Sequence, residues 1–242
     1  MIRCHLLCYH WFRADGAEAR GARADLEIEA SRFGRQLDLL SESGFGTIHL
    51  ADLLDPPPAG LPARPVVICV DDGSACFARF ALPELERRGL CATLFAVAGK
   101  LGGRADWDPG EPPRKLLERG QLVELQSAGC EIGSHGMTHR DLRTLGDAAL
   151  RDELVRSRDL LGEALGRPPG FLAYPYGACD ARSKAFAAAA GYRGACAVAL
   201  DAPDLLCSQR FCLMRIYVMA TEPLLGFALR LLAAGWIRHE VS

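Results

Sequence analysis

Short apolar runs alternate with amphipathic segments along most of the chain, and this alternation restricts the fold more than any other feature. Repeated β-α units of this kind indicate an α/β fold with a parallel sheet, closed or nearly closed into a barrel. The predicted strands are Ile2–Tyr9, Val66–Val70, Cys91–Val97, Cys130–Gly133, Gly170–Tyr174, Gly194–Ala199 and Phe211–Val218. The predicted helices are Ala30–Ser43, Ala75–Arg88, Glu118–Ala128, Asp147–Leu165, Ala181–Ala190 and Glu222–Ala234.

Composition limits the size of the core and the kinds of partner. With 242 residues, half of them hydrophobic, the chain has enough apolar material for one barrel or open sheet, with two small domains as the alternative. The net charge of −2 gives no electrostatic reason to expect nucleic acid or an anionic membrane as a partner. No apolar run approaches the roughly 20 residues that span a bilayer, and the N-terminus lacks the features of a signal peptide. Ten cysteines without any Cys-x-x-Cys pair are typical of buried thiols in a reducing compartment. We therefore expect a cytoplasmic protein.

A pair of acidic residues follows one apolar run directly. Asp71 and Asp72 come after Val66–Val70, with Gly73 behind them. A charge at the end of a buried strand is costly without a partner, and α/β barrels form their active sites where strands end. The pair therefore indicates a functional site, although the same residues also suit a turn in which Ser74 caps the next helix.

Two histidines follow another predicted strand. His135 and His139 are four residues apart and can face the same way on one helical turn, which suits a shared metal ion. This spacing alone is a weak signal. Two imidazoles and one carboxylate, however, form a recurrent open ligand set for Zn²⁺ and other first-row ions, and Asp72 would supply the carboxylate.

A third segment, Phe171–Gly177, also runs from a strand into a tight turn. Pro175 and Gly177 suit the corner of a barrel strand. The backbone of such a turn can also serve catalysis.

Together these segments resemble the motifs of the polysaccharide deacetylases, the family of the nodulation chitooligosaccharide deacetylase. The family's Thr-Phe-Asp-Asp-Gly appears as Cys69–Gly73, its His-Ser/Thr-x-x-His as His135–His139, and its Arg-x-Pro-Tyr-Gly as Ala173–Gly177. Softer matches at Gly89–Phe95, Cys8–His10 and Phe33–Leu54 extend the likeness over nearly the whole chain, and the last two resemble the biofilm poly-N-acetylglucosamine deacetylases.

The resemblance implies a single domain over residues 1–242 with a distorted (β/α)7 barrel. It implies that Asp72, His135 and His139 hold one divalent ion, with Zn²⁺ expected and Co²⁺ or Ni²⁺ as alternatives. It further implies that Asp71 is the general base and that the backbone N–H of Tyr176 helps to bind the oxyanion.

The chain departs from the family pattern in two places. Ala173 replaces the arginine that opens the third motif and braces the base, and the late Leu-x-His that gives the general acid is missing. In the biofilm-type members an N-terminal Tyr-His supplies the acid, so His10 is the candidate, with a surface or capping histidine as the alternative. Arg215 lies in an apolar strand, where an unpaired charge is expensive. We expect it to pair with Asp71, or else to form a salt bridge elsewhere.

The expected activity is metal-dependent removal of N-acetyl groups from an amino-sugar-containing glycan or glycoconjugate precursor. One alternative is hydrolysis of a non-sugar amide or imide C–N bond on the same fold. A second is a degenerate member that binds glycan without turnover. Trp107, in the loop Gly99–Pro113, favours a sugar ring, although a loop tryptophan is also often a packing lid. The oligomeric state is open.

Overall fold

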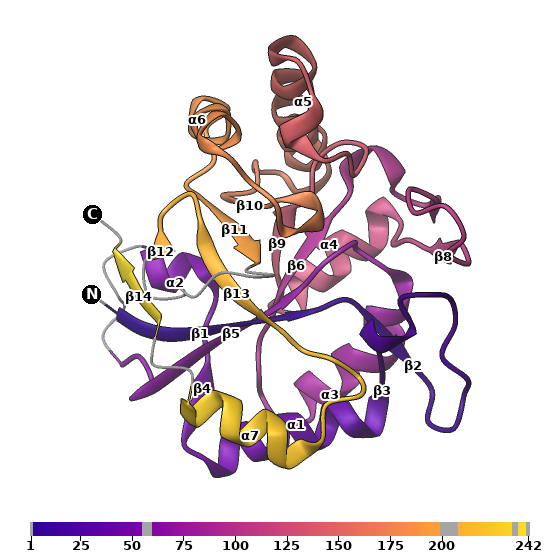
Figure 1. Ribbon diagram of the computed structural model, residues 1–242, viewed down its shortest axis with the longest axis vertical. Coiled ribbons are helices and arrows are strands. Elements are labelled where there is room, and N and C mark those ends of the chain that lie inside the picture. The colour runs from indigo at the N-terminus through magenta and orange to yellow at the C-terminus, as the bar shows by residue number, and fades with distance from the viewer. Residues whose placement is uncertain (1, 55–59, 199–207, 234–236, 241–242) are drawn as a thin grey trace.

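Seven parallel strands close into a barrel in the computed structural model, which describes residues 2–54, 60–198, 208–233 and 237–240 (Figure 1). In barrel order the strands are β1 (Ile2–Tyr9), β5 (Arg64–Val70), β6 (Thr93–Ala96), β9 (Glu131–Ser134), β10 (Phe171–Ala173), β11 (Gly194–Val198) and β13 (Leu213–Tyr217). The last of these pairs with β1 and completes the ring. This confirms the predicted distorted (β/α)7 barrel.

The closure depends on β1, which lies between β5 and β13. Leu7 stands opposite Ile68 on one side and Ile216 on the other, and both pairings are parallel. Residues of β5 then alternate between two apolar environments, as strand geometry requires. Val67 and Cys69 pack in one cluster with residues such as Phe95, whereas Ile68 packs in a second cluster with residues such as Phe33 of α1.

Helices surround the barrel. They are α1 (Ala30–Glu42), α2 (Leu50–Leu54), α3 (Leu82–Glu86), α4 (Arg119–Ser127), α5 (Asp147–Leu165), α6 (Ala181–Ala189) and α7 (Leu224–Ala233). Figure 1 shows α1, α3 and α7 together on one side of the barrel and α5 and α6 on the opposite side. The predicted helices agree with these bounds to within two residues, apart from the segment Ala75–Arg88. The expected end of a strand at Ala199 and the expected end of a helix at Ala234 lie outside the described residues.

The prediction of one continuous helix over Ala75–Arg88 was wrong. The segment begins with a π-helical turn at Phe77–Ala81 and continues as the short helix α3. Pro83 stands in the first turn of α3 and has no backbone N–H to donate to the preceding turn. A wider turn before the proline is one way in which a helix accommodates this loss.

Several short elements were not predicted. They are the five-residue helix α2 and the strands β2 (Trp11–Arg13), β3 (Glu27–Glu29), β4 (Phe45–Thr47), β7 (Arg104–Ala105), β8 (Arg114–Lys115), β12 (Ser208–Gln209) and β14 (Ile237–Glu240), with helical turns at Ala24–Leu26, Ala98–Lys100, Leu142–Thr144 and Pro175–Gly177. Runs of two to five residues are too short to show a hydrophobic period. Among the described residues no helix is long and apolar enough to cross a membrane.

The packing of β9 against β6 generates a prediction about stability. A Cβ added to Gly133 would lie 2.5 Å from Cδ1 of Phe95 and 3.2 Å from the carbonyl oxygen of Phe171. Gly133→Ala should therefore lower the free energy of unfolding by about 1–3 kcal/mol, measured by urea denaturation. Gly120→Ala is the control, because a Cβ there meets nothing within 4 Å and alanine favours a helix. Equal stability of Gly133→Ala and the wild type would contradict this packing.

Candidate active site

The carboxyl ends of β1, β5, β9 and β10 bring the predicted residues to one rim of the barrel. A pocket there is lined by His10, Asp71, Asp72, His135, His139 and Tyr176, together with Trp11, Arg23, Leu26, Trp107, Asp108, Gly177 and Tyr217. Arg215 lies beneath this pocket in β13 and contacts it through Asp71. Residues far apart in the sequence therefore share one site.

Asp72, His135 and His139 form a compact cluster of metal-ligand atoms. Nε2 of His135 lies 3.6 Å and Nε2 of His139 lies 3.4 Å from Oδ1 of Asp72. Two ligands of a tetrahedral ion with bonds of about 2.0–2.1 Å lie about 3.3 Å apart. The three side chains are at most 5% exposed. Spacing and donor chemistry therefore both fit one first-row divalent ion.

The imidazole of His135 is oriented for this role. Its Nδ1 lies 2.8 Å from the carbonyl oxygen of Ala173, so Nδ1–H donates there and Nε2 presents its lone pair to the cluster. Burial lowers the pKa of His135 to about 4, with the nearby His139 adding to the effect and Asp71 opposing it. The ring is therefore neutral near pH 7, which is the form that binds a metal.

The turn that carries His139 is held from outside the barrel. Glu153 of α5, which is buried, accepts hydrogen bonds from the backbone N–H of Met137 at 2.8 Å and of Thr138 at 3.0 Å, and from the Thr138 hydroxyl. The carboxylate thus satisfies a turn whose residues Gly136 and His139 both have a positive φ. Glu153 was missed in the sequence, although its position three residues after Leu150 places it on the apolar face of the helix.

Backbone strain is concentrated at the site. The described non-glycine residues with a positive φ are Asp72 at 72°, His139 at 62° and Tyr176 at 59°. Each such conformation costs on the order of 1 kcal/mol or more. Strain of this kind tends to persist where a function fixes the backbone, which supports the assignment of this rim as the active site.

Asp71 forms a buried ion pair with Arg215. The guanidinium contacts both carboxylate oxygens, at 2.6 Å and 2.9 Å, and the arginine is 1% exposed. Burial alone would raise the pKa of Asp71, but Arg215, His135 and His10 outweigh it and hold the pKa below its ordinary value. The pair expected from the sequence is present, and Asp71 is ionised at neutral pH.

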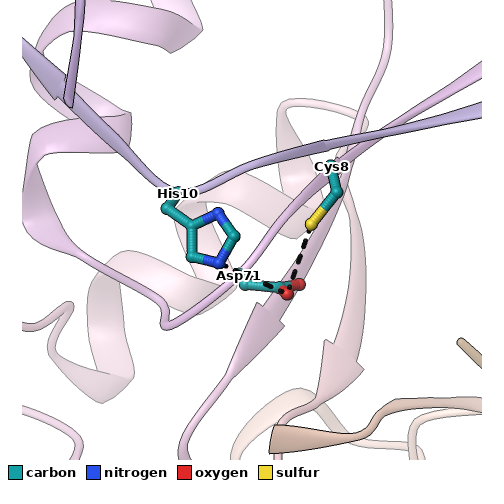
Figure 2. A group of neighbouring side chains, drawn as sticks. All are labelled: Cys8, His10 and Asp71. Carbon is teal, nitrogen blue, oxygen red and sulfur yellow. Dashed lines mark hydrogen bonds and ion pairs between the residues drawn. The ribbon is translucent and has the colours of Figure 1, made fainter. Parts of the chain in front are cut away.

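Two further side chains approach Asp71 from the end of β1, as Figure 2 shows. Sγ of Cys8 lies 3.5 Å from Oδ2 of Asp71, and Nε2 of His10 lies 4.0 Å from the same oxygen. These three groups also have the spacing of metal ligands. A cation there would face the guanidinium of Arg215, and burial raises the pKa of the Cys8 thiol, so it remains protonated. The group is therefore better described as the surroundings of Asp71 than as a metal centre.

His10 is placed by stacking rather than by hydrogen bonds. Its ring lies parallel to that of Tyr217, with centroids 5.3 Å apart and an interplanar angle of 17°. Its Nδ1 has no hydrogen-bond partner among the described residues. Burial lowers the pKa of His10, whereas Asp71 and Asp72 oppose that effect. His10 is thus a pocket residue, and its role as the acid stays a prediction.

Aromatic rings cover the histidine side of the pocket. Trp107 stacks on His139 with centroids 4.3 Å apart, and Tyr176 meets the same imidazole edge-on at 4.8 Å. The Tyr176 hydroxyl donates to Oδ1 of Asp108 at 3.2 Å. The loop Gly99–Pro113 therefore does cover the site.

Comparison with known proteins agrees with this geometry. A family model described as polysaccharide deacetylase matches residues 59–195, more than half of the chain. The chain belongs to the polysaccharide deacetylase family. The matched range contains all three motif segments of the chain but excludes His10 and Arg215, the two residues expected to replace missing family features.

Individual relatives are distant in sequence but similar in fold. YxkH of Bacillus subtilis, itself named as a polysaccharide deacetylase, is 24% identical over 170 residues, which cover 69% of this chain and 57% of YxkH. The deacetylase PplD of Streptococcus pyogenes superposes with a TM-score of 0.74 at 19% identity, covering 97% of this chain and 98% of that one. IcaB from Ammonifex degensii gives a TM-score of 0.72 at 22% identity, covering 95% and 97%. The chain thus spans little more than half of the curated relative, and the two solved structures support the barrel fold.

The buried ion pair between Asp71 and Arg215 generates a second prediction. Arg215→Met leaves the Asp71 carboxylate buried without a partner and should destabilise the fold by about 3–5 kcal/mol in chemical denaturation. The double variant Arg215→Met/Asp71→Asn should recover much of that loss, because no buried charge remains. Arg182→Met, which removes an exposed ion pair with Asp147, should change stability far less. A mild Arg215→Met effect equal to this control would show that the pair is not needed for folding.

Proposed function

We propose that this protein is a metal-dependent hydrolase that removes N-acetyl groups from an amino-sugar-containing glycan or glycoconjugate precursor. The observation that carries the proposal is the Asp72–His135–His139 cluster beside a separate ionised carboxylate, Asp71. One group of residues can thus hold a Lewis acid while the neighbouring aspartate remains available for proton transfer.

The metal site fits a single divalent ion, with Zn²⁺ expected and Co²⁺ or Ni²⁺ also compatible with two imidazoles and one carboxylate. When bound, such an ion supplies Lewis-acid chemistry: it polarises an amide carbonyl and makes water a better nucleophile at neutral pH. The residues of the chain that would hold it are already close together, and Ala173 orients one of them.

Asp71 acts as the general base in this proposal. Its carboxylate is ionised, and the two-point contact with Arg215 fixes its orientation. The guanidinium thereby takes the place of the family arginine that is Ala173 here. Because the ion pair lowers the pKa of Asp71, the group accepts a proton only transiently, which suits a base that must pass the proton on.

His10 is the candidate for the group that delivers the proton to the departing amine. Because burial keeps this imidazole neutral, it must gain a proton during the reaction, and Asp71, whose Oδ2 lies 4.0 Å away, can pass on the proton that it takes from water. This distance exceeds hydrogen-bond reach, although such contacts often tighten when a substrate binds. Without a proton donor, the amine would be a poor leaving group.

Tyr176 serves through its backbone in the proposed mechanism. The left-handed conformation at Tyr176, followed by Gly177 with φ 68°, turns the chain sharply at the end of β10 beside His139. A backbone N–H placed at such a turn can stabilise the oxyanion of a tetrahedral intermediate, an effect commonly of about 3 kcal/mol per donor.

A second candidate keeps the same site and changes the substrate to a non-sugar amide or imide C–N bond. Trp107 favours the sugar, because its ring packs on His139 at the pocket and such aromatic faces suit the apolar face of a pyranose. A substrate panel that compares N-acetylated oligosaccharides with cyclic imides separates the two. Acetate release combined with elemental analysis also tests the remaining alternative, a degenerate protein that binds glycan without turnover.

The separation of base and ligands gives a third prediction. Asp71→Asn should retain a stoichiometric metal ion yet lose turnover by about 100-fold or more, because no base remains. His135→Ala should instead lose the ion, measured by elemental analysis after dialysis. Circular dichroism checks that both variants are folded. Normal acetate release by Asp71→Asn would remove the base assignment, and a fully metallated, active His135→Ala would refute the ligand set.

The role of His10 gives a fourth prediction. His10→Ala should lower kcat by about 100-fold or more while metal content stays the same, since the departing amine loses its proton donor. His49→Ala is the matched control, because His49 lies outside the pocket and contacts the carbonyl oxygen of Gly129. Unchanged kinetics in His10→Ala would return this residue to a purely structural role.

A further inference from the structure

Arg23 brings a positive charge into the pocket that the proposed reaction does not use. It lies in the connection between β2 and β3 and is the only lysine or arginine among the described residues that line the pocket. Within the described part of the chain its guanidinium forms no ion pair and no side-chain hydrogen bond. It is half-buried, so its charge is partly shielded from water.

Among the described residues none of the carboxylates that line the pocket forms an ion pair with Arg23. Asp71 is held by Arg215, Asp72 lies against the two metal-binding imidazoles, and Asp108 accepts the Tyr176 hydroxyl. Arg23 nonetheless shares the pocket with His10, and it adds to burial and to Arg215 in lowering the pKa of that imidazole. The pocket therefore contains a cation near the proposed acid with no anion of its own.

The backbone around Arg23 is held in place from two directions. Its N–H donates to Oε1 of Glu111 at 2.9 Å, which ties the connection to the loop that carries Trp107. Nearby, the buried Arg114 donates to Oε1 of Glu27 at 2.7 Å and to the carbonyl oxygen of Arg20 at 3.0 Å. This network fixes the stretch of chain before Arg23. The guanidinium of Arg23 itself takes no part in it.

We propose that Arg23 recognises an anionic group, a carboxylate or a phosphate, on the acetamido sugar or on the unit linked to it. The inference rests on the proposed deacetylase function and narrows its substrate to an anionic glycan. A guanidinium presents a planar fork of donors that matches the oxygens of either group, and such charge-assisted bonds are stronger than neutral ones. A neutral chitooligosaccharide would leave this charge unmatched.

The test compares Arg23→Gln, Arg23→Lys and wild type, each loaded with Zn²⁺. The substrates are a neutral N-acetylglucosamine oligomer, an oligomer that alternates N-acetylglucosamine with a uronic acid, and N-acetylglucosamine 1-phosphate. Arg23→Gln should raise KM for at least one anionic substrate by about ten-fold or more, because a charged hydrogen bond is lost. KM for the neutral oligomer should change less than about two-fold, and Arg23→Lys should recover part of the loss. Whichever anionic substrate responds identifies carboxylate or phosphate as the source.

Arg20→Gln is the matched control. Arg20 lies on the same connection, is exposed and does not line the pocket, so its loss should leave every KM unchanged. Equal losses on neutral and anionic substrates in Arg23→Gln would show that Arg23 contacts a group common to all of them and would overturn the inference. No loss on any substrate would overturn it as well.

A binding measurement separates this inference from the proposed reaction. Calorimetric titration of both anionic compounds and the neutral oligomer into Zn²⁺-loaded wild type and Arg23→Gln does not require turnover. Arg23-dependent binding of an anionic compound without acetate release from any substrate would refute the deacetylase and uphold the anion site. Acetate release that is the same in Arg23→Gln and the wild type would uphold the deacetylase and refute the anion site.

Discussion

The burial of two neighbouring carboxylates at the end of β5 is the constraint around which the rest of the site is arranged. Asp71 and Asp72 are each 3% exposed, and a buried carboxylate is stable only beside a compensating charge or hydrogen-bond donors. The protein compensates the negative charges of these two carboxylates in different ways. Arg215 holds Asp71 ionised, whereas Asp72 faces the imidazoles of His135 and His139 and has no cationic side chain paired with it among the described residues. The difference between the proposed base and the proposed metal ligand therefore comes from their partners, since the two residues are chemically identical.

Closure of the barrel gives Asp71 and Asp72 these different partners. Arg215 comes from β13 and Asp71 from the end of β5, and these strands lie on opposite sides of β1. The ion pair therefore joins the two neighbours of β1, and the thiol of Cys8 in β1 contacts the same carboxylate. In an open sheet with β1 at an edge, the two charges would be far apart. The pair thus stabilises the same strand order that brings His10, at the end of β1, to the pocket.

Much of this arrangement could be predicted from the sequence. The strands of the barrel and the long helices have clear hydrophobic periods, and the motif around Asp71, the pair His135 and His139, and the Tyr176 turn follow predicted strands. The cost of a charge in an apolar strand predicted a partner for Arg215, and the family arginine that is missing at Ala173 indicated Asp71, with a salt bridge elsewhere as the alternative. Glu153 and the position of Arg23 were missed, because each depends on packing between segments distant in the sequence. The short pair β2 and β3 that supports Arg23 has three residues in each strand, too few to show a pattern.

The contact between Glu153 and the turn after β9 gives the outer layer of the protein a part in the chemistry. A single carboxylate on α5 accepts the donors of Met137 and Thr138, immediately before His139. The position of the His139 imidazole, a proposed metal ligand, therefore depends on how a peripheral helix packs against the barrel. A substitution that shifts this helix, even one remote from the pocket, would change the affinity for the ion while every liganding side chain remains intact.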